Sequence, residues 1–194
     1  MERDELKRKR YLDDVRHKDS RTLVFIDETS AYVGQSREYG WASSDKRVYD
    51  TRPKGKKERV SLIAATSLDG SMAEQALVVT DTVNKNAFLC FLETTLLPTL
   101  AEGSIVVMDN WTVHHGEEVR ELVERFGCEL LYLPTYSPDL NPIEHLFAKV
   151  KAFIKSLRPE SSDKLIEAFC NAVKVITSEN VLNSYRHCGY FVGQ

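Results

Sequence analysis

The chain has 194 residues, of which 42% are hydrophobic and 28% are charged, and its net charge is −3. This composition is typical of a globular protein, and at this length about 70% of the unfolded surface is buried on folding. No apolar run approaches the roughly 20 residues of a membrane span, and the chain begins without the apolar segment of a signal peptide. We therefore expect a cytoplasmic protein with no membrane partner, in which any DNA contact comes from local basic patches.

The sequence has no motif of a zinc protein or of a nucleotide-binding enzyme. The four cysteines are widely spaced and form no CxxC pair, so the sequence carries no recognisable zinc motif. It also lacks the GxxxxGK[ST] phosphate loop of nucleotide enzymes.

The first twenty residues are almost wholly charged, with a basic run at residues 7–10 followed by Asp13, Asp14 and Asp19. Few apolar positions interrupt these charges, so we expect a charged linker or solvated helix over residues 1–20. A single domain is predicted to follow over residues 21–194. A DNA contact is the less favoured alternative for the charged segment.

A first strand is predicted over residues 22–26, a short apolar run that ends at Asp27 and Glu28. An inserted loop is expected over residues 28–57. From position 46 to position 59 the chain has seven basic and two acidic residues, and this local excess of positive charge can neutralise phosphates. A solvated loop without a DNA contact is an equal alternative. The candidate DNA contacts are Lys46, Arg47, Arg52, Lys54, Lys56 and Lys57.

The next elements complete one side of the predicted sheet. Residues 60–66 and 72–79 are apolar runs on either side of Asp69-Gly70, a strong signal for a tight hairpin of antiparallel strands. Apolar residues at helical spacing then predict a helix over residues 84–97, which stops at Pro98.

Residues 105–108 form a continuous apolar run, the pattern of a strand that is covered on both faces. Asp109 follows directly, at the carboxyl end where open α/β sheets bind ligands. If this strand and the first strand are parallel neighbours, Asp27 and Asp109 lie about 4.8 Å apart. Two carboxylates at that separation can share a divalent ion.

A third carboxylate follows after a short helix over residues 115–126 and a strand over residues 129–133. Asn141 is a good N-cap, Pro142 fits a first helical turn, and apolar residues then recur at helical spacing. Glu144 therefore projects from a rigid first turn, with 34 residues between it and Asp109. Asn141 and Glu144 also fit a capping box, so a purely structural role remains an alternative, with Asp139 as the next candidate acid.

Two lysines of this predicted helix, Lys151 and Lys155, are further candidates for DNA contacts. A basic outer helix face without a ligand is the slightly favoured alternative. Two more amphipathic helices are expected within residues 161–194.

Three sequence pieces together resemble one family. FIDET with Asp27, MDN with Asp109 and YSPDLNPIEHLF with Glu144 resemble the catalytic domain of mariner-like DDE transposases, in their bacterial insertion-sequence branch. The resemblance covers about residues 20–190, and YSPDLNPIE is its most specific piece. His114 also matches the family pattern, whereas Phe147 stands where tryptophan is common.

The resemblance implies an α/β, RNase H-like fold: a mixed five-stranded sheet, with three antiparallel strands and then two parallel ones, flanked by helices. It implies that Asp27, Asp109 and Glu144 are catalytic and bind Mg²⁺, or Mn²⁺ as a substitute, with His114 in support. The implied activity is metal-dependent DNA strand cleavage and strand transfer.

The same resemblance implies partners. These are transposon ends, target DNA, a second copy of the chain, and an N-terminal helix-turn-helix segment from an upstream reading frame, in a bacterial, nucleoid-associated setting. The alternative is a truncated or domesticated DNA-binding protein that no longer cleaves DNA.

Overall fold

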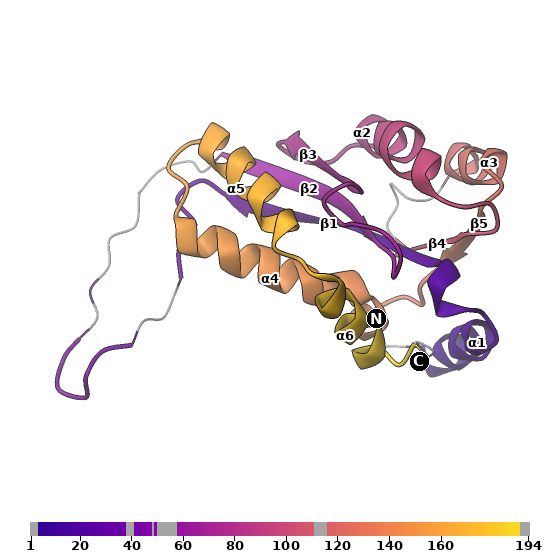
Figure 1. Cartoon of the computed structure of the whole chain (residues 1–194), viewed down its shortest axis with the longest axis horizontal. Helices are drawn as coiled ribbons and strands as arrows, with labels where there is room; N and C mark the ends of the chain where they lie inside the picture. Colours follow the sequence, from indigo (N-terminus) through magenta and orange to yellow (C-terminus); the bar gives the residue numbers. More distant parts are fainter. Residues whose placement is uncertain (1–3, 38–40, 48, 50–57, 111–115, 191–194) are drawn as a thin grey trace.

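The computed structural model of this chain contains a five-stranded sheet in the order β3-β2-β1-β4-β5, with helices on both faces (Figure 1). The structure describes residues 4–37, 41–47, 49, 58–110 and 116–190. β1 to β3 pair antiparallel, and β4 and β5 continue the sheet in parallel with β1, so the predicted arrangement is confirmed. The strands are β1 (Leu23–Tyr32), β2 (Arg59–Thr66), β3 (Ala76–Thr80), β4 (Ile105–Met108) and β5 (Glu129–Tyr132).

The helices form a layer on each face of the sheet, and Figure 1 shows α4 and α5 on the side opposite α2 and α3. One layer contains α4 (Pro142–Leu157), α5 (Ser162–Lys174) and α6 (Ser178–His187). The other contains α2 (Lys85–Cys90), its π-helical continuation η2 (Phe91–Leu96), the 3-10 turn η3 (Leu97–Thr99) and α3 (Glu117–Arg125). The remaining elements are α1 (Glu5–Arg16) and the 3-10 turns η1 (Ser20–Thr22) and η4 (Pro138–Leu140).

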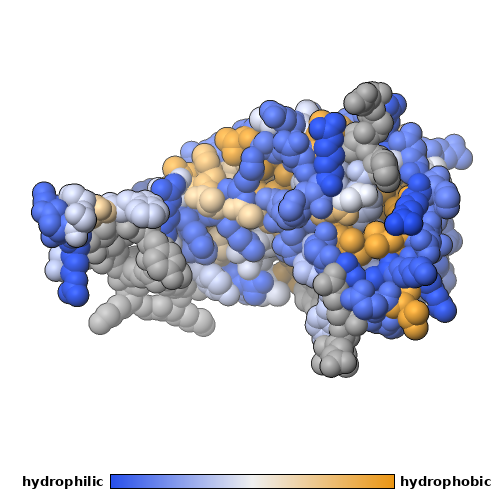
Figure 2. Space-filling view, turned by 90° about the horizontal axis from the view of Figure 1, so that it is seen from below, coloured by the Kyte–Doolittle hydropathy of each residue, from blue (hydrophilic) through white to orange (hydrophobic). Residues whose placement is uncertain are grey.

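The exterior is largely polar. In Figure 2, hydrophilic residues cover most of the visible face and hydrophobic ones are scattered among them. Within the described ranges, no helix is both long enough and apolar enough to cross a membrane.

Alternation along β1 divides the hydrophobic core into two. Leu23 and Phe25 pack in the cluster that includes α4, α5 and α6, whereas Val24 and Ile26 pack in the cluster that includes α2, η2 and α3. Because side chains alternate between the faces of a strand, Asp27 belongs to the face of Phe25, on the α4 side. The strand pattern thus places this acid toward the helix that carries Glu144.

β1 extends further than the sequence indicated. It was expected to end at Ile26, but it continues through Asp27 to Tyr32, so the inserted segment begins only after Tyr32. The reason is β2, which pairs with β1 along this whole length, up to Tyr32 opposite Arg59. Pairing with β4 covers only the beginning of β1, so Asp27 lies in a rigid strand just past the end of the parallel ladder.

The antiparallel strands predicted on either side of Asp69-Gly70 are confirmed as β2 and β3, but the tight turn between them is wrong. β2 ends at Thr66 and β3 begins at Ala76, so residues 67–75 connect them. Met72, which the apolar pattern assigned to the second strand, is instead buried in this connection. A turn in which the amide of Gln75 donates to the carbonyl of Ser71 (3.1 Å) brings the chain back into the sheet.

The N-terminal helix α1 is docked on the domain and is not merely solvated. Arg8 is only 7% exposed, and its guanidinium donates to both carboxylate oxygens of Asp139 in η4 at 3.1 and 2.7 Å. The hydroxyl groups of Tyr11 and Tyr190 lie 2.8 Å apart, and the Tyr190 hydroxyl donates to the carbonyl of Leu140 at 2.6 Å. Two chains of contacts therefore join α1 to the turn that precedes α4.

The contact between Arg8 and Asp139 predicts a measurable loss of stability. Asp139→Asn leaves the buried guanidinium with only the more distant carboxylate of Glu5, at 3.9 Å. Because the Asp139 carboxylate is half-exposed, we expect the free energy of unfolding to fall by about 1–3 kcal/mol. Asp13→Asn is the control, since Asp13 pairs with Arg16 on the surface and its loss costs less than about 1 kcal/mol. Urea unfolding of both variants provides the measurement. Equal losses would show that α1 is not fixed by this ion pair.

Candidate functional site

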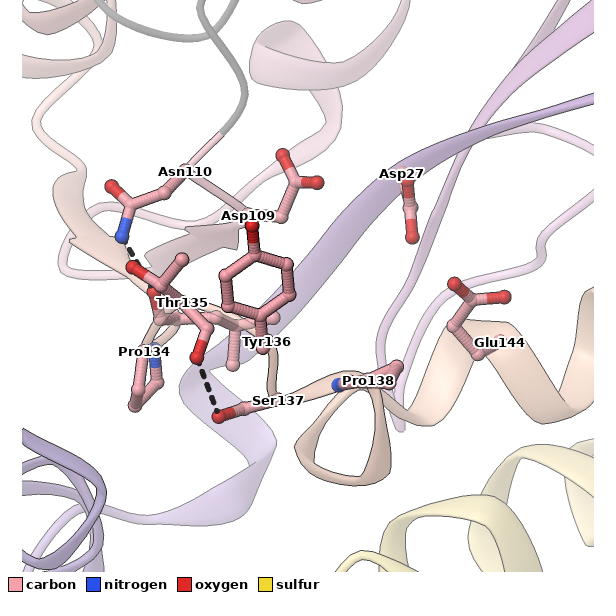
Figure 3. Close-up of a pocket in the computed structure, with 10 residues that line it drawn as sticks. Asp27, Asp109, Asn110, Pro134, Thr135, Tyr136, Ser137, Pro138 and Glu144 are labelled. Atoms are coloured by element: carbon pink, nitrogen blue, oxygen red, sulfur yellow. Dashed lines mark hydrogen bonds between the residues drawn. The ribbon is translucent and has the colours of Figure 1, made fainter. Parts of the chain in front are cut away.

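A pocket of about 380 Å³ brings together the three acids that the sequence singled out. Asp27 comes from the middle of β1, Asp109 directly follows β4, and Glu144 lies in the first turn of α4. Figure 3 shows the three carboxyl groups on one wall of the pocket, facing the segment before α4. Residues 133–138 and Asn110 line the rest of it.

The strand register explains why the two aspartates meet. β1 and β4 are parallel neighbours, and their ladder pairs Phe25 with Val107. Two residues further along each strand, Asp27 and Asp109 lie level with one another and on the same face. α4 packs against β1 on this face and adds Glu144.

The carboxyl group of Asp27 is partly buried and has two hydrogen-bond donors. The side-chain amide of Asn141 donates to Oδ2 at 2.9 Å, and the backbone amide of Glu28 donates to Oδ1 at 2.7 Å. Burial raises the pKa of Asp27 to about 8, with further upward contributions from Glu144, Glu28 and Asp109 that outweigh the hydrogen bond from Glu28. Without a cation, this carboxyl group therefore holds its proton more strongly than an ordinary aspartate does.

Asn141 is the N-cap residue of α4 but does not cap it with its side chain, so the structure does not form the capping box that was the alternative role for Glu144. The amide of Asn141 is directed to Asp27, and its buried Oδ1 atom has no hydrogen-bond partner in the described part of the chain. The helix begins instead with a backbone contact, in which the amide of Glu144 donates to the carbonyl of Asn141 at 3.2 Å. The exposed carboxylate of Glu144 consequently has no capping role and faces the pocket.

The segment before α4 forms the opposite wall. The side-chain amide of Asn110 donates to the carbonyl of Leu133 at 2.9 Å, which ties the end of β4 to the end of β5. Tyr136 has a left-handed backbone with φ of 57° and is 58% exposed where it lines the pocket. Its ring provides a flat apolar surface beside the acids, on which a nucleic-acid base can stack. Asn110 and Tyr136 stand within the sequence pieces MDN and YSPDLNPIEHLF, but no local pattern indicated a role for either side chain.

Of the other predicted site residues, those that the structure describes do not line the pocket of the acids. His114 lies outside the described residues, as do Arg52, Lys54, Lys56 and Lys57. Lys46 and Arg47 are exposed on the segment between β1 and β2, near the fully exposed Trp41. Lys155 is half-buried near the end of α4, and Lys151 lines a separate pocket.

The donors in the pocket are those that Mg²⁺ and Mn²⁺ prefer, because hard divalent cations take carboxylate oxygens. Within the described ranges, no group of three or more His, Cys, Asp or Glu side chains forms a ready-made metal site. The pKa of Asp27 is raised first by burial and then by the neighbouring acids, and a bound dication would favour the charged forms of all three. The donor chemistry therefore fits a divalent ion.

The sequence matches a known protein family. Residues 22–166 match the family model described as DDE superfamily endonuclease. The transposable element Tc1 transposase of Caenorhabditis elegans is 34% identical over 88 residues, which are 43% of this chain and 32% of that protein. The chain thus spans about a third of the length of this curated relative.

Two solved structures of Mos1 transposase share the fold at low identity. The paired-end complex with the left transposon end superposes with a TM-score of 0.75 at 19% identity, over 93% of this chain and 56% of that chain. The Mos1 mariner paired-end complex with Mn gives a TM-score of 0.70, also at 19% identity and over the same shares of both chains. The fold is therefore RNase H-like.

The hydrogen bond from Asn141 to Asp27 predicts that the substitution Asn141→Asp lowers stability. Aspartate is as good an N-cap as asparagine, so Asn141→Asp would be neutral if the residue only capped α4. Because its side chain faces Asp27, the substitution replaces an amide donor by one more buried carboxyl group within a cluster of acids, and we expect the free energy of unfolding to fall by about 1–3 kcal/mol at neutral pH. Urea unfolding without divalent ions provides the measurement.

Ser161→Asp is the matched control for this substitution. Ser161 caps α5 with its hydroxyl, which accepts from the amide of Lys164, and aspartate retains that role. A loss in Asn141→Asp no larger than in Ser161→Asp would contradict the contact with Asp27.

Proposed function

Because the chain belongs to the DDE superfamily endonucleases, we propose that it is the catalytic domain of a Tc1/mariner-like transposase, which cleaves DNA strands and joins them to target DNA. The observation that supports this most strongly is the pocket shared by Asp27, Asp109 and Glu144. The relatives whose sequence or fold the chain shares are transposases, and one of the structures is a complex with a transposon end.

In this proposal, Asp27, Asp109 and Glu144 hold Mg²⁺, or Mn²⁺ as in one of the similar structures. Divalent ions bound by such carboxylates stabilise the attacking and leaving oxygens of an in-line displacement at phosphorus. The acids act as ligands, so no covalent bond between enzyme and DNA is expected.

The protein's own residues fix the orientation of these ligands. Asn141 and the amide of Glu28 hold both oxygens of Asp27, so this carboxylate cannot turn freely. Asp109 is held at the end of a fully buried strand, and Glu144 projects from the first turn of a sixteen-residue helix. Tyr136 offers a stacking surface for a base next to the reacting phosphate. Ligands placed on rigid elements keep the geometry that phosphoryl transfer requires.

The proposal extends to the origin, location and partners of the chain. We propose that the chain comes from a bacterial insertion sequence and is associated with the nucleoid in the cytoplasm. We also propose that it assembles as a homodimer on DNA. An N-terminal helix-turn-helix segment would recognise the transposon ends, and His114 would support Asp109. The domain proper is proposed to span residues 21–194, with residues 1–20 joining it to that segment.

Metal binding gives a test that needs no DNA. A ligand at 100 times its Kd stabilises the native state by about 2.7 kcal/mol. We expect Mg²⁺ or Mn²⁺ to raise the Tm of the wild type, and Asp27→Asn or Asp109→Asn to lessen this gain, because each variant loses a charged ligand. Thermal unfolding with and without the metal chloride measures the gain. An equal gain in the wild type and both variants would exclude a shared metal site.

Cleavage is tested best at Glu144, because its helix does not need the side chain as a cap. Glu144→Gln should unfold within about 0.5 kcal/mol of the wild type. It should nevertheless lose metal-dependent nicking of the element's terminal DNA, since an amide is a poor ligand for a hard dication. The assay uses the chain joined to its end-binding segment.

Glu179→Gln is the matched control, because Glu179 is also an acid in the first turn of a helix, α6. This variant should cleave like the wild type. Normal cleavage by Glu144→Gln would show that Glu144 is not the third acid. DNA binding without cleavage by the wild type would favour the alternative of a domesticated DNA-binding protein.

A further inference from the structure

A second pocket, of about 180 Å³, lies beside the part of β1 that continues past β4. Its walls come from β1, β2, the segment after β3 and α4, and they carry two cations and four hydroxyl groups. These residues are Arg59, Lys151, Thr29, Ser30, Ser61 and Thr82. We propose that this pocket binds a phosphate group of the DNA backbone through Arg59 and Lys151. The proposal rests on the proposed function, since it takes DNA as the ligand.

Polar groups in the walls lack the partners that buried groups normally have. Among the residues that the structure describes, the buried Nε atom of Arg59 has no hydrogen-bond acceptor, and the buried hydroxyl of Thr29 has no partner. Lys151 is half-buried and forms no ion pair with any residue that the structure describes. Buried polar groups are nearly always satisfied in folded proteins, so unpaired donors beside two cations indicate an anionic ligand.

The chemistry of the two cations suits phosphate. An arginine guanidinium presents a planar set of donors that matches phosphate oxygens, and a lysine ammonium adds a compact charge. Glu28 also lines the pocket. The pocket walls therefore carry two positive charges and one negative charge. The hydroxyl of Ser61 already donates to the carbonyl of Asp81, which leaves the cations as the principal donors. The whole chain has a net charge of −3, so attraction to DNA has to arise in such local sites.

The position of the pocket fits a DNA strand that runs past the acids. Asp27 and Glu28 are consecutive in β1, and they line the acidic pocket and the second pocket respectively. On α4, Lys151 follows Glu144 by seven residues, which places it on the same helix face about 10 Å further along the axis. A nucleotide advances about 3.4 Å along the duplex axis. The two pockets are therefore far enough apart to hold different phosphates of one strand.

The test measures how binding of a fluorescent random-sequence duplex depends on salt, in metal-free buffer. Each phosphate that the protein neutralises adds about 0.9 to the steepness of log K against log salt. Arg59→Gln and Lys151→Gln should each lower the slope by up to this amount. The double variant should lower it little more than the single ones, because both side chains hold the same phosphate.

Lys149→Gln is the matched control, because Lys149 is an exposed lysine of the same helix that does not line the pocket. It should lower the slope less than Lys151→Gln does, and Lys151→Arg should restore the wild-type slope. Lys151 lies on a helix surface, so its variants keep the test decisive if Arg59→Gln fails to fold.

Three outcomes are distinguished. An unchanged slope in Lys151→Gln, with normal DNA binding by the wild type, overturns the phosphate pocket and leaves the proposed function intact. Absence of DNA binding by the wild type overturns the phosphate pocket, whereas the proposed function is decided separately by the cleavage assay on the chain joined to its end-binding segment. If the variants bind inorganic phosphate more weakly than the wild type does but keep the wild-type salt slope for DNA, the pocket is a site for free phosphate. That result overturns the DNA contact.

Discussion

The structure depends on the close approach of three carboxylic acids around Asp27. The parallel register of β1 and β4 places Asp27 and Asp109 level with each other, and the first turn of α4 adds Glu144. Burial and the neighbouring acids raise the pKa of Asp27 to about 8, so the site resists full ionisation by itself. Such an arrangement contributes little to stability and is understood best as a site for a cation.

The scaffold around the acids restrains them from several directions. Asn141 holds Asp27, and Asn141 directly follows the turn that Arg8 and Tyr190 fix from outside. A helix at the beginning of the chain is thereby connected to the carboxylate through a few direct contacts. Unfolding of α1 would therefore loosen the restraint on Asp27, although α1 itself contributes no residue to the pocket.

Local patterns in the sequence were sufficient for much of this account. The apolar run before Asp109 and the helical spacing after Asn141 predicted β4 and α4, because each pattern is set by neighbours in the chain. The resemblance on Asp27, Asp109 and Glu144 supplied the sheet arrangement, which the structure confirms.

Features that depend on distant partners could not be predicted in this way. β1 extends to Tyr32 because β2 pairs with it, and Met72 is buried in a connection that looked like a strand. Arg8 contacts a residue 131 positions away, so its local surroundings indicated only a charged linker. Asn141 had the identity and position of an N-cap, and only the fold shows that its amide is directed to Asp27.

The central claim is that Asp27, Asp109 and Glu144 together bind a divalent metal ion. Anomalous diffraction from crystals of the protein grown with Mn²⁺ tests it most directly. The account predicts anomalous difference density between these three carboxylates, and its loss in crystals of Asp27→Asn. Mn²⁺ density elsewhere on the protein, with none in this pocket, would contradict the account.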